Sequence, residues 1–398
     1  MKKSVLFLLL IALLFSVVAC EFFYAVEDEL YGDEYSYDDE YYDDEYYDDE
    51  EYSDDEYTDD EYADEAPTDS EPAPSANGEI SALPQSDSSA DCTNGETFHA
   101  DVGLCYLDGG QAIPLFASMM DGVTEYADTI EEKLLDDEYT IVTYAVDGNE
   151  IYSPDYANVS GDLQAYQDDT ATQEMIWHYY AAIIPQEARD MLVGYKVVSD
   201  GQGGSLAMVE QASDDPTEWL LSVDIADTKD LRDLTYTLIH EYGHLLTLNE
   251  NQLDIDENVF FNYDDDDIYY AAEESCATYF PGEGCAKSNA YIYLFYRDFW
   301  AGFYDEWSEF QYIEDDDDYY DALDNFYYKY EDQFVTDYAA TNVGEDIAES
   351  WTFFIISEKP AGNSIAEEKI LFFYQFPELV ALREEMVART YSRMIRMQ

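Results

Sequence analysis

One stretch of this sequence reads Thr235-Tyr-Thr-Leu-Ile-His240-Glu241-Tyr242-Gly243-His244-Leu-Leu and places two of only four histidines in an HExxH frame. On a helix, residues four apart are separated by about 400° of rotation and about 6 Å of rise, so His240 and His244 project from one face toward a common point. One Zn²⁺ fits between two such imidazoles. Glu241 lies about 100° further round, where its carboxylate reaches a water on the metal without being the third ligand. The spacing therefore predicts two zinc ligands and a general base.

The residues around this motif predict that it lies on a buried helix with one functional side. Apolar residues recur at helical spacing on the face opposite the histidines, at Leu231, Leu234, Leu238, Tyr242 and Leu245. Asp227 and Asp230 indicate the N-terminal cap of this helix. Gly243 costs a helix interior about 1 kcal/mol relative to alanine, which indicates that another segment packs closely against it.

The motif leaves the third zinc ligand open. The metzincin class needs a glycine at position 247 and a histidine at position 250, but the chain has Thr247 and Glu250, so that class is excluded. Among the carboxylates, Glu345 and Glu349 lie four residues apart on an amphipathic segment, so one can bind the metal while the other accepts the N–H of a ligating imidazole. Two exposed carboxylates on a helix are the alternative, and Glu274 and Glu250 are the next candidates for the ligand.

The third ligand is indicated by a resemblance in the segment Thr336-Asp-Tyr338-Ala-Ala-Thr341-Asn342-Val-Gly-Glu345-Asp-Ile-Ala348-Glu349-Ser-Trp. This segment resembles the part of anthrax-lethal-factor-type gluzincins that carries the third zinc ligand, and it is similar to bacterial zinc metallopeptidases with a Glu-x-x-Ala-Glu pattern. The resemblance implies that Glu345 is the ligand and that Glu349 supports a ligating imidazole from behind. It also implies that Tyr338 is the active-site tyrosine, which donates to the oxyanion as it forms. It covers only this segment and the HExxH stretch.

The pattern of predicted elements agrees with the fold that this resemblance implies. The elements before the HExxH helix are a hairpin with its turn at 147–148, one helix and three strands, over 139–146 and 149–152, 175–184, 192–198, 205–211 and 219–223. The chain after the motif is predicted mostly helical, with a capping box from Ser364 to Glu367 and an interruption at Pro377. We therefore expect an α+β, zincin-like two-lobed fold, with 205–211 as the edge strand that borders the cleft.

The first residues predict export. Met1, Lys2 and Lys3 precede an apolar run over 4–18, which is the pattern of a signal peptide, and the run ends in Val17-Val18-Ala19-Cys20. These four residues look like a bacterial lipobox with valine in place of the more frequent leucine. We therefore expect Cys20 to become a lipidated N-terminus on the extracytoplasmic face of a membrane. An ordinary signal peptide is the alternative, and a transmembrane anchor is disfavoured because the run is short.

The next segment, 21–90, is of low complexity and very acidic. A Tyr-x-Asp-Asp-Glu-like period runs through 37–64, so charge repulsion and the lack of aliphatic side chains predict a disordered tether. Loose binding of Ca²⁺ or of basic surfaces is an alternative function of this segment. The formal net charge of the whole chain is −77, which argues against nucleic acid as a partner. Residues 91–398 remain for a single zincin-like metallopeptidase domain.

Four cysteines remain when Cys20 is set aside, an even number in a chain that we expect to be exported. Of the three possible connectivities we favour the two local pairings, Cys92 with Cys105 and Cys276 with Cys285, because each closes a short loop that contains glycine. A second metal site of four thiolates is the alternative, and the lack of any CxxC pair disfavours it.

The sequence thus predicts a membrane-tethered, extracytoplasmic zinc metalloendopeptidase that hydrolyses a peptide or protein substrate with water activated by Glu241. A non-catalytic, zinc-containing surface lipoprotein for adhesion or cation binding is the alternative, and a closed site with four protein ligands would favour it. A zinc hydrolase that acts on another substrate is a third possibility. The two histidines outside the motif are expected not to bind metal, with His178 in the core and His99 at the surface.

Overall fold

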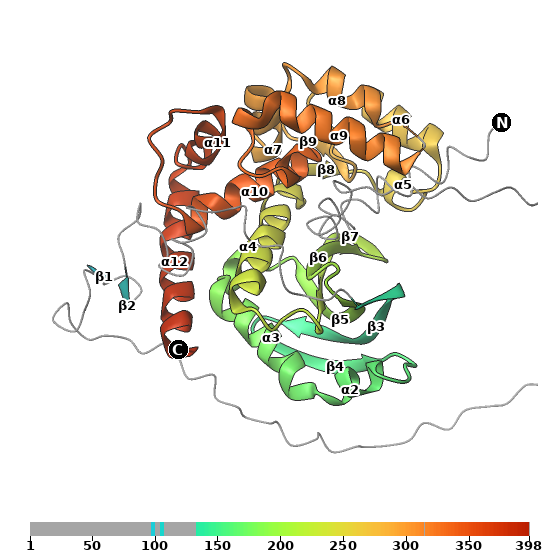
Figure 1. Cartoon of the computed structure of the whole chain (residues 1–398), viewed down its shortest axis with the longest axis vertical. Helices are drawn as coiled ribbons and strands as arrows, with labels where there is room; N and C mark the ends of the chain where they lie inside the picture. The colour runs from blue at the N-terminus through green and yellow to red at the C-terminus, as the bar shows by residue number, and fades with distance from the viewer. Residues whose placement is uncertain (1–96, 100–103, 107–132, 314, 398) are drawn as a thin grey trace, which may run out of the picture. The chain divides into compact units, whose positions relative to one another are not determined.

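Residues 97–99, 104–106, 133–313 and 315–397 are described by the computed structural model of the chain (Figure 1). All of them belong to one of the two units into which the chain divides. They form a mixed α+β fold that contains a five-stranded sheet, a series of helices and two small two-stranded sheets. The α+β class expected from the sequence is confirmed. The predictions for the signal peptide, for Cys20 and for the acidic tether fall outside the described residues.

The five-stranded sheet has the order β4-β3-β5-β7-β6. Its strands are β3 (Lys133–Asp147), β4 (Glu150–Tyr156), β5 (Leu192–Gln202), β6 (Ala207–Ala212) and β7 (Asp215–Asp224). β5 and β7 run parallel, and the other neighbours are antiparallel. All three strands predicted before the HExxH helix are present. Within the described chain β6 pairs with β7 alone, which makes it the edge strand that the sequence placed over 205–211.

The hairpin of β3 and β4 differs from the prediction by one residue at its turn. Asp147 pairs with Glu150, so the two connecting residues are Gly148 and Asn149 rather than 147–148. Gly148 adopts a φ of 61°, a left-handed conformation that glycine reaches at little cost. The position of the turn therefore follows the residue that tolerates this conformation.

Helix α3 (Thr170–Ile183) lies in the chain between β4 and β5 and contacts the HExxH helix through Tyr179. It begins earlier than the predicted 175–184 because Asp169 caps its first turn. The Tyr179 hydroxyl on α3 lies 2.5 Å from Thr235 Oγ1 on the HExxH helix. This buried contact holds the two helices against each other.

The HExxH stretch forms helix α4 (Leu231–Leu248), which lies between β6 and helix α10 (Val343–Ile356) (Figure 1). Asp230 caps α4 by accepting hydrogen bonds from two backbone N–H groups of its first turn, as predicted. Asp227 does not take part in this cap, because its carboxylate accepts from the backbone N–H of Gly203 instead. α4 is buried, as predicted, and α10 packs against the side that carries the histidines.

Gly243 allows α4 and α10 to approach closely. A Cβ atom at this position would lie 3.0 Å from Ala348 Cα and 3.1 Å from Trp351 Cδ1. A side chain there would force the two helices apart or displace the Trp351 ring. The close neighbour predicted from the glycine is therefore confirmed, and it is α10. This approach brings the first turns of α10 against the two histidines.

The chain after α4 is mostly helical, as predicted. Its α-helices, strands and π-helix are β8 (Leu253–Ile255), α5 (Glu257–Phe260), α6 (Asp266–Ser275), β9 (Gly284–Ala286), α7 (Tyr291–Phe295), the π-helix Tyr296–Trp300, α8 (Tyr304–Phe310), α9 (Asp316–Tyr330), α11 (Ile365–Phe373) and α12 (Pro377–Met397), besides α10. Before α4 lie also β1 (Thr97–His99), β2 (Leu104–Tyr106) and α2 (Leu163–Asp168). Ser364 caps α11 by accepting from the Glu367 N–H at 3.2 Å, which confirms the capping signal. Pro377 separates α11 from α12 and occupies the first position of α12, where its missing N–H costs nothing.

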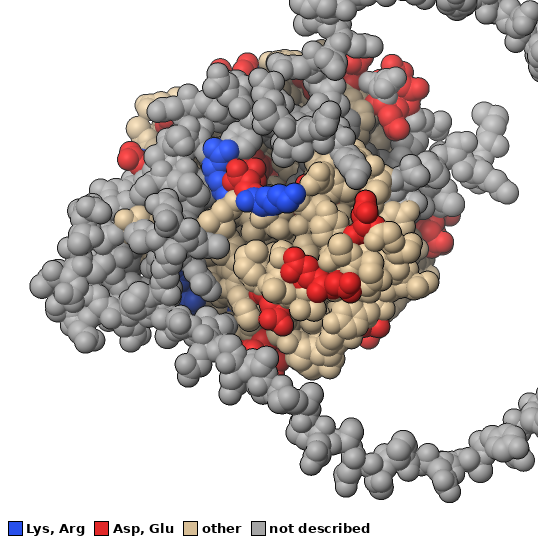
Figure 2. All heavy atoms as spheres, turned by 60° about the horizontal axis from the view of Figure 1, so that its bottom comes forward, with Lys and Arg blue, Asp and Glu red and all other residues tan. Residues whose placement is uncertain are grey.

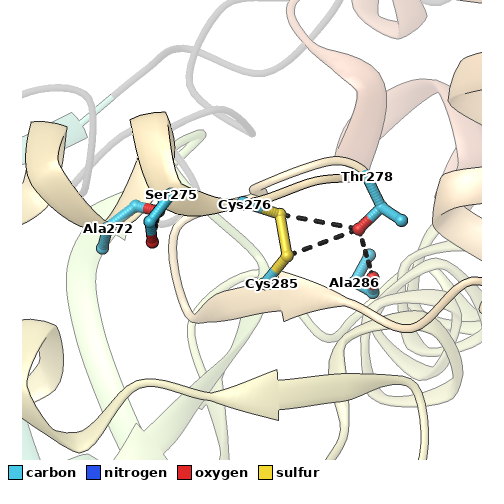
Figure 3. The surroundings of a disulfide bond; sticks show 6 residues. All are labelled: Ala272, Ser275, Cys276, Thr278, Cys285 and Ala286. Atoms are coloured by element: carbon cyan, nitrogen blue, oxygen red, sulfur yellow. Dashed lines mark hydrogen bonds between the residues drawn. A yellow bond between two sulfur atoms is a disulfide. The ribbon is translucent and has the colours of Figure 1, made fainter.

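A disulfide between Cys276 and Cys285 closes the loop between α6 and β9 (Figure 3). It is one of the two pairings that the sequence favoured. The Thr278 hydroxyl lies inside the loop, 3.5 Å from Cys276 Sγ and 3.4 Å from Cys285 Sγ. β9 pairs with β8, which follows α4 closely in the chain, so the disulfide secures this loop near the C-terminal end of α4. The other favoured pair, Cys92 with Cys105, lies outside the described side chains.

The described part of the chain has no helix that is both long and apolar enough to cross a membrane. Acidic side chains are spread over the face of the molecule drawn in Figure 2, whereas basic side chains gather mainly at one place. The negative charge of this protein is therefore not confined to the residues before position 91.

Candidate metal centre

His240, Glu241 and His244 form a buried group on α4 that can hold a metal ion. One nitrogen or oxygen atom from each residue lies within 4.8 Å of the others, and the two Nε2 atoms are 3.1 Å apart. The four-residue spacing puts both imidazoles on one face of α4, as expected from the sequence. The imidazole rings meet edge to face, with their centroids 4.8 Å apart.

Helix α10 adds the buried carboxylate of Glu345. Its Oε2 atom lies 3.1 Å from His240 Nε2 and 3.4 Å from His244 Nε2. Asn342 caps α10 and accepts a hydrogen bond from the Glu345 N–H at 2.9 Å, which fixes the turn that carries this carboxylate. The structure therefore places the carboxylate implied by the resemblance against both imidazoles.

The carboxylate of Glu349 lies behind His240. Its Oε1 atom is 2.8 Å from His240 Nδ1, and its Oε2 atom accepts hydrogen bonds from the hydroxyls of Tyr236 at 2.7 Å and Thr336 at 2.6 Å. Because the two hydroxyls hold one oxygen, the other stays directed at the imidazole. The Nδ1–H of His240 donates to it, which orients the ring so that Nε2 faces Glu345.

The charges of this group favour a cation at its centre. Burial lowers the pKa of His240, but Glu345 and Glu349 outweigh burial and hold the pKa well above its usual range. Burial raises the pKa of Glu345, but His244 and His240 outweigh it and hold the pKa far below its usual range. Two buried carboxylates on α10 therefore favour positive charge beside them, which either a protonated imidazole or a divalent metal ion can supply.

The pKa of Glu241 is shifted in the opposite direction from that of Glu345. Burial raises its pKa to about 7, against the lowering effect of His244 and His240. The backbone of Val209 in β6 lowers this pKa as well, which places the edge strand beside the Glu241 carboxylate. A carboxyl group that exchanges protons near neutral pH, next to one that stays ionised, can act as an acid–base catalyst beside a metal ligand.

Tyr338 lies on the short 3-10 helix Tyr338–Ala340, directly before α10, and is half-buried. Its ring centroid is 5.8 Å from that of His240. All six side chains that the sequence assigned to the site, on α4, on α10 and on this turn, are thus brought together. Both alternative ligands, Glu250 and Glu274, are exposed.

Three neighbours of the site were not predicted. Tyr236 lies four residues before His240, so helical spacing alone could have indicated that it shares the same face. Thr336 stands at the start of the resembling segment, but nothing in its spacing indicates a contact with Glu349. Burial raises the pKa of Glu283 to about 7 and His244 lowers it, so this carboxyl also lies near the group. No local pattern could identify Glu283, because only tertiary structure joins its loop to α4.

Of the two histidines outside the motif, His178 is not among the residues that form the group. His178 is half-buried on α3, between the buried residues Trp177 and Tyr179, so it is less buried than the predicted core position implied. The side chain of His99 lies outside the described ones. Comparison of the chain with protein-family models, with curated proteins and with solved structures finds no match.

Proposed function

We propose that this chain is a zinc metallopeptidase of gluzincin type, with a zincin-like two-lobed fold. The observation that carries the proposal is the triangle of His240 Nε2, His244 Nε2 and Glu345 Oε2, whose edges are 3.1, 3.1 and 3.4 Å. Ligands about 2.0–2.1 Å from a tetrahedral Zn²⁺ lie about 3.3 Å from one another, so the triangle fits one face of such a site. Two imidazoles and one carboxylate are also the donor set of catalytic zinc sites, which keep their fourth position for water or substrate.

The side chains around this triangle suit peptide hydrolysis. Zn²⁺ held there supplies a Lewis acid for water and for a peptide carbonyl. Glu241 accepts the proton of the attacking water and delivers it to the leaving amine, and its raised pKa suits both transfers. Tyr338 donates a hydrogen bond to the carbonyl oxygen as that atom gains negative charge. Glu349 keeps the His240 ring in the orientation that binding requires.

The edge strand β6 favours a peptide over other classes of substrate. Its outer side pairs with no strand in the part of the chain that the structure describes, and Val209 in its middle lies beside Glu241. An extended peptide that pairs with such an edge is held by its main chain, so the scissile bond is presented to the general base whatever the side chains are.

We propose further that the enzyme works outside the cytoplasm and is held at a membrane through Cys20 and the segment 21–90. The disulfide between Cys276 and Cys285 supports an oxidising compartment. The lipobox-like residues before Cys20 support the lipid anchor. Palmitate labelling that persists in a Cys20→Ser variant would contradict the anchor without affecting the peptidase proposal.

The peptidase proposal is tested with the zinc-loaded full chain and its Glu241→Gln variant. Glutamine keeps the size of the side chain and removes the base, so hydrolysis of an unstructured protein should fall at least about a hundredfold while zinc per chain stays unchanged. Glu250→Gln changes an exposed glutamate just beyond α4 and should keep both zinc and activity. No hydrolysis by the unmodified chain, or equal rates in the Glu241→Gln variant, would favour the non-catalytic zinc protein.

A further inference from the structure

A second group of carboxylates lies where β5 and β7 end, away from the histidines. It consists of Asp200 near the end of β5, Asp224 at the end of β7 and Asp227 in the link to α4, and one oxygen of each lies within 4.8 Å of the others. Because β5 and β7 are parallel neighbours, their carboxyl ends meet at the same edge of the sheet. Asp200 and Asp224 are buried, and Asp227 is half-buried.

Backbone N–H groups hold these carboxylates in place. Asp224 accepts from the N–H of Asp200 at 2.7 Å and from that of Ala226 at 2.6 Å. Both oxygens of Asp227 accept from the N–H of Gly203, at 3.1 and 3.2 Å. Gly203 has a φ of 94°, which few other residues adopt. The three side chains are therefore fixed in position without any side-chain donor among these contacts.

One oxygen of the group accepts no hydrogen bond from an N–H or hydroxyl donor of the residues that the structure describes. Asp200 is 7 % exposed, and its Oδ2 accepts from the Ser205 N–H at 3.0 Å, but its Oδ1 has no hydrogen-bond donor. The hydroxyl of Ser205, a residue that is 6 % exposed, has no partner either. A buried carboxylate oxygen left in this way costs the desolvation energy of a charged group, unless a ligand compensates it.

No cationic side chain forms an ion pair with the three aspartates among the described side chains. Burial, together with the neighbouring Asp200 carboxylate, raises the pKa of Asp224 to about 8. Burial also raises the pKa of Asp227 to about 6, and Lys229 opposes this shift only partly. Three carboxyl groups thus lie close together with no cationic side chain paired to them, so Asp224 favours its protonated form unless a cation binds beside it.

We propose that Asp200, Asp224 and Asp227 bind a hard divalent cation of the Ca²⁺ class. The donors are all oxygen, which suits Ca²⁺ or Mg²⁺ and does not suit zinc, for which the histidine site is available. The cation would join the ends of β5 and β7 to the link that enters α4 at Asp230. From that cap to His240 the helix rises about 15 Å, so the cation would stabilise the start of the helix that carries the metal centre without touching it.

The proposal is tested by thermal unfolding of the zinc-loaded full chain in buffer freed of Ca²⁺ and Mg²⁺, and again with millimolar CaCl₂ or MgCl₂. Zinc per chain is measured in every sample. Two variants remove one charge each. Asp200→Asn keeps an oxygen for the Ser205 N–H and places an amide nitrogen where Oδ1 has no donor, and Asp227→Asn keeps an oxygen for the Gly203 N–H. Asp214→Asn, an exposed aspartate in the turn between β6 and β7, is the matched control.

The unmodified chain and Asp214→Asn should gain the same increase in Tm on addition of the cation, because both keep Asp200, Asp224 and Asp227 and a ligand that binds only the folded state stabilises it. Asp200→Asn and Asp227→Asn should lose that increase. In the cation-free buffer they should unfold at or above the temperature of the unmodified chain, because each relieves repulsion. If the cation raised Tm equally in all four proteins, the effect would come from surface carboxylates. If Asp200→Asn and Asp227→Asn lowered Tm equally with and without the cation, the aspartates would serve only to hold the turns. Either result overturns the proposal.

Discussion

Glu349 Oε1 lies 2.8 Å from His240 Nδ1, and this contact links α10 to the middle of α4. The same helix brings Glu345 to the opposite nitrogen of the same ring, at 3.1 Å. One turn of α10 separates the two glutamates, so both nitrogens of His240 face carboxylates from one helix. The position of α10 therefore sets the geometry of the centre, and α4 alone does not define it.

The contact with Glu349 predicts a graded loss of zinc affinity. Glu349→Ala removes the acceptor that orients His240, so the Kd for zinc should rise about ten- to a hundredfold. Tyr236→Phe removes only one of the two hydroxyls that hold Glu349 Oε2, so it should raise the Kd less. Competition with a chromophoric chelator measures both values. Unchanged affinity in Glu349→Ala would show that the ring is held by packing alone.

Glu345 predicts a larger effect on the metal itself. Glu345→Ala leaves two imidazoles, which hold Zn²⁺ poorly, so most zinc should be lost together with activity. Glu274→Ala removes an exposed glutamate that was a rival candidate, and it should keep one zinc per chain. Metal analysis after gel filtration distinguishes the two variants. Full zinc content in Glu345→Ala would move the third ligand to another acid.

Local sequence patterns predicted the structural features that depend on interactions between residues close together in the chain. The HExxH spacing predicted which side chains share a face of α4, and Gly243 predicted a close neighbour without saying which. The three strand-like runs over 192–198, 205–211 and 219–223 predicted β5, β6 and β7, and the cap at Ser364 predicted the start of α11. Each of these depends on residues within a few positions of one another.

Contacts between distant segments could not be predicted in the same way. Spacing offered Glu345 and Glu349 as candidates among very many carboxylates, and only a resemblance indicated Glu345 as the third ligand. Asp227 was expected to cap α4, but the parallel pairing of β5 and β7 brings it to Asp200 instead. Glu283 reaches the neighbourhood of His244 through the loop that the disulfide closes. In each case the partner is chosen by tertiary packing, which spacing along the chain does not encode.

Gly243 predicts that a single methyl group disturbs the metal centre. Alanine favours the helix by about 1 kcal/mol, but a Cβ 3.0 Å from Ala348 Cα overpacks the contact, which typically costs about 1–3 kcal/mol. Gly243→Ala should therefore lower Tm and weaken zinc binding, because separation of the helices moves Glu345 and Glu349 from His240. Gly302→Ala is the control, since nothing lies within 4 Å of a Cβ there. A Gly243→Ala variant with higher Tm and unchanged zinc affinity would show that the helix contact is adaptable.

The pH dependence of hydrolysis should identify Glu241 as the base. Burial raises its pKa to about 7 and the two histidines lower it, and zinc at their Nε2 atoms adds positive charge that lowers it further. The base acts when ionised, so kcat/KM should be constant above this pKa and should fall about tenfold per pH unit below it. The apparent pKa of this acid limb should lie below the value of about 7 given by burial in the absence of metal. Zinc content, measured at each pH, separates this titration from loss of the metal. If the residual activity of Glu241→Gln still fell below the same apparent pKa, the titrating group would not be Glu241. Glu283 would then be the next group to test.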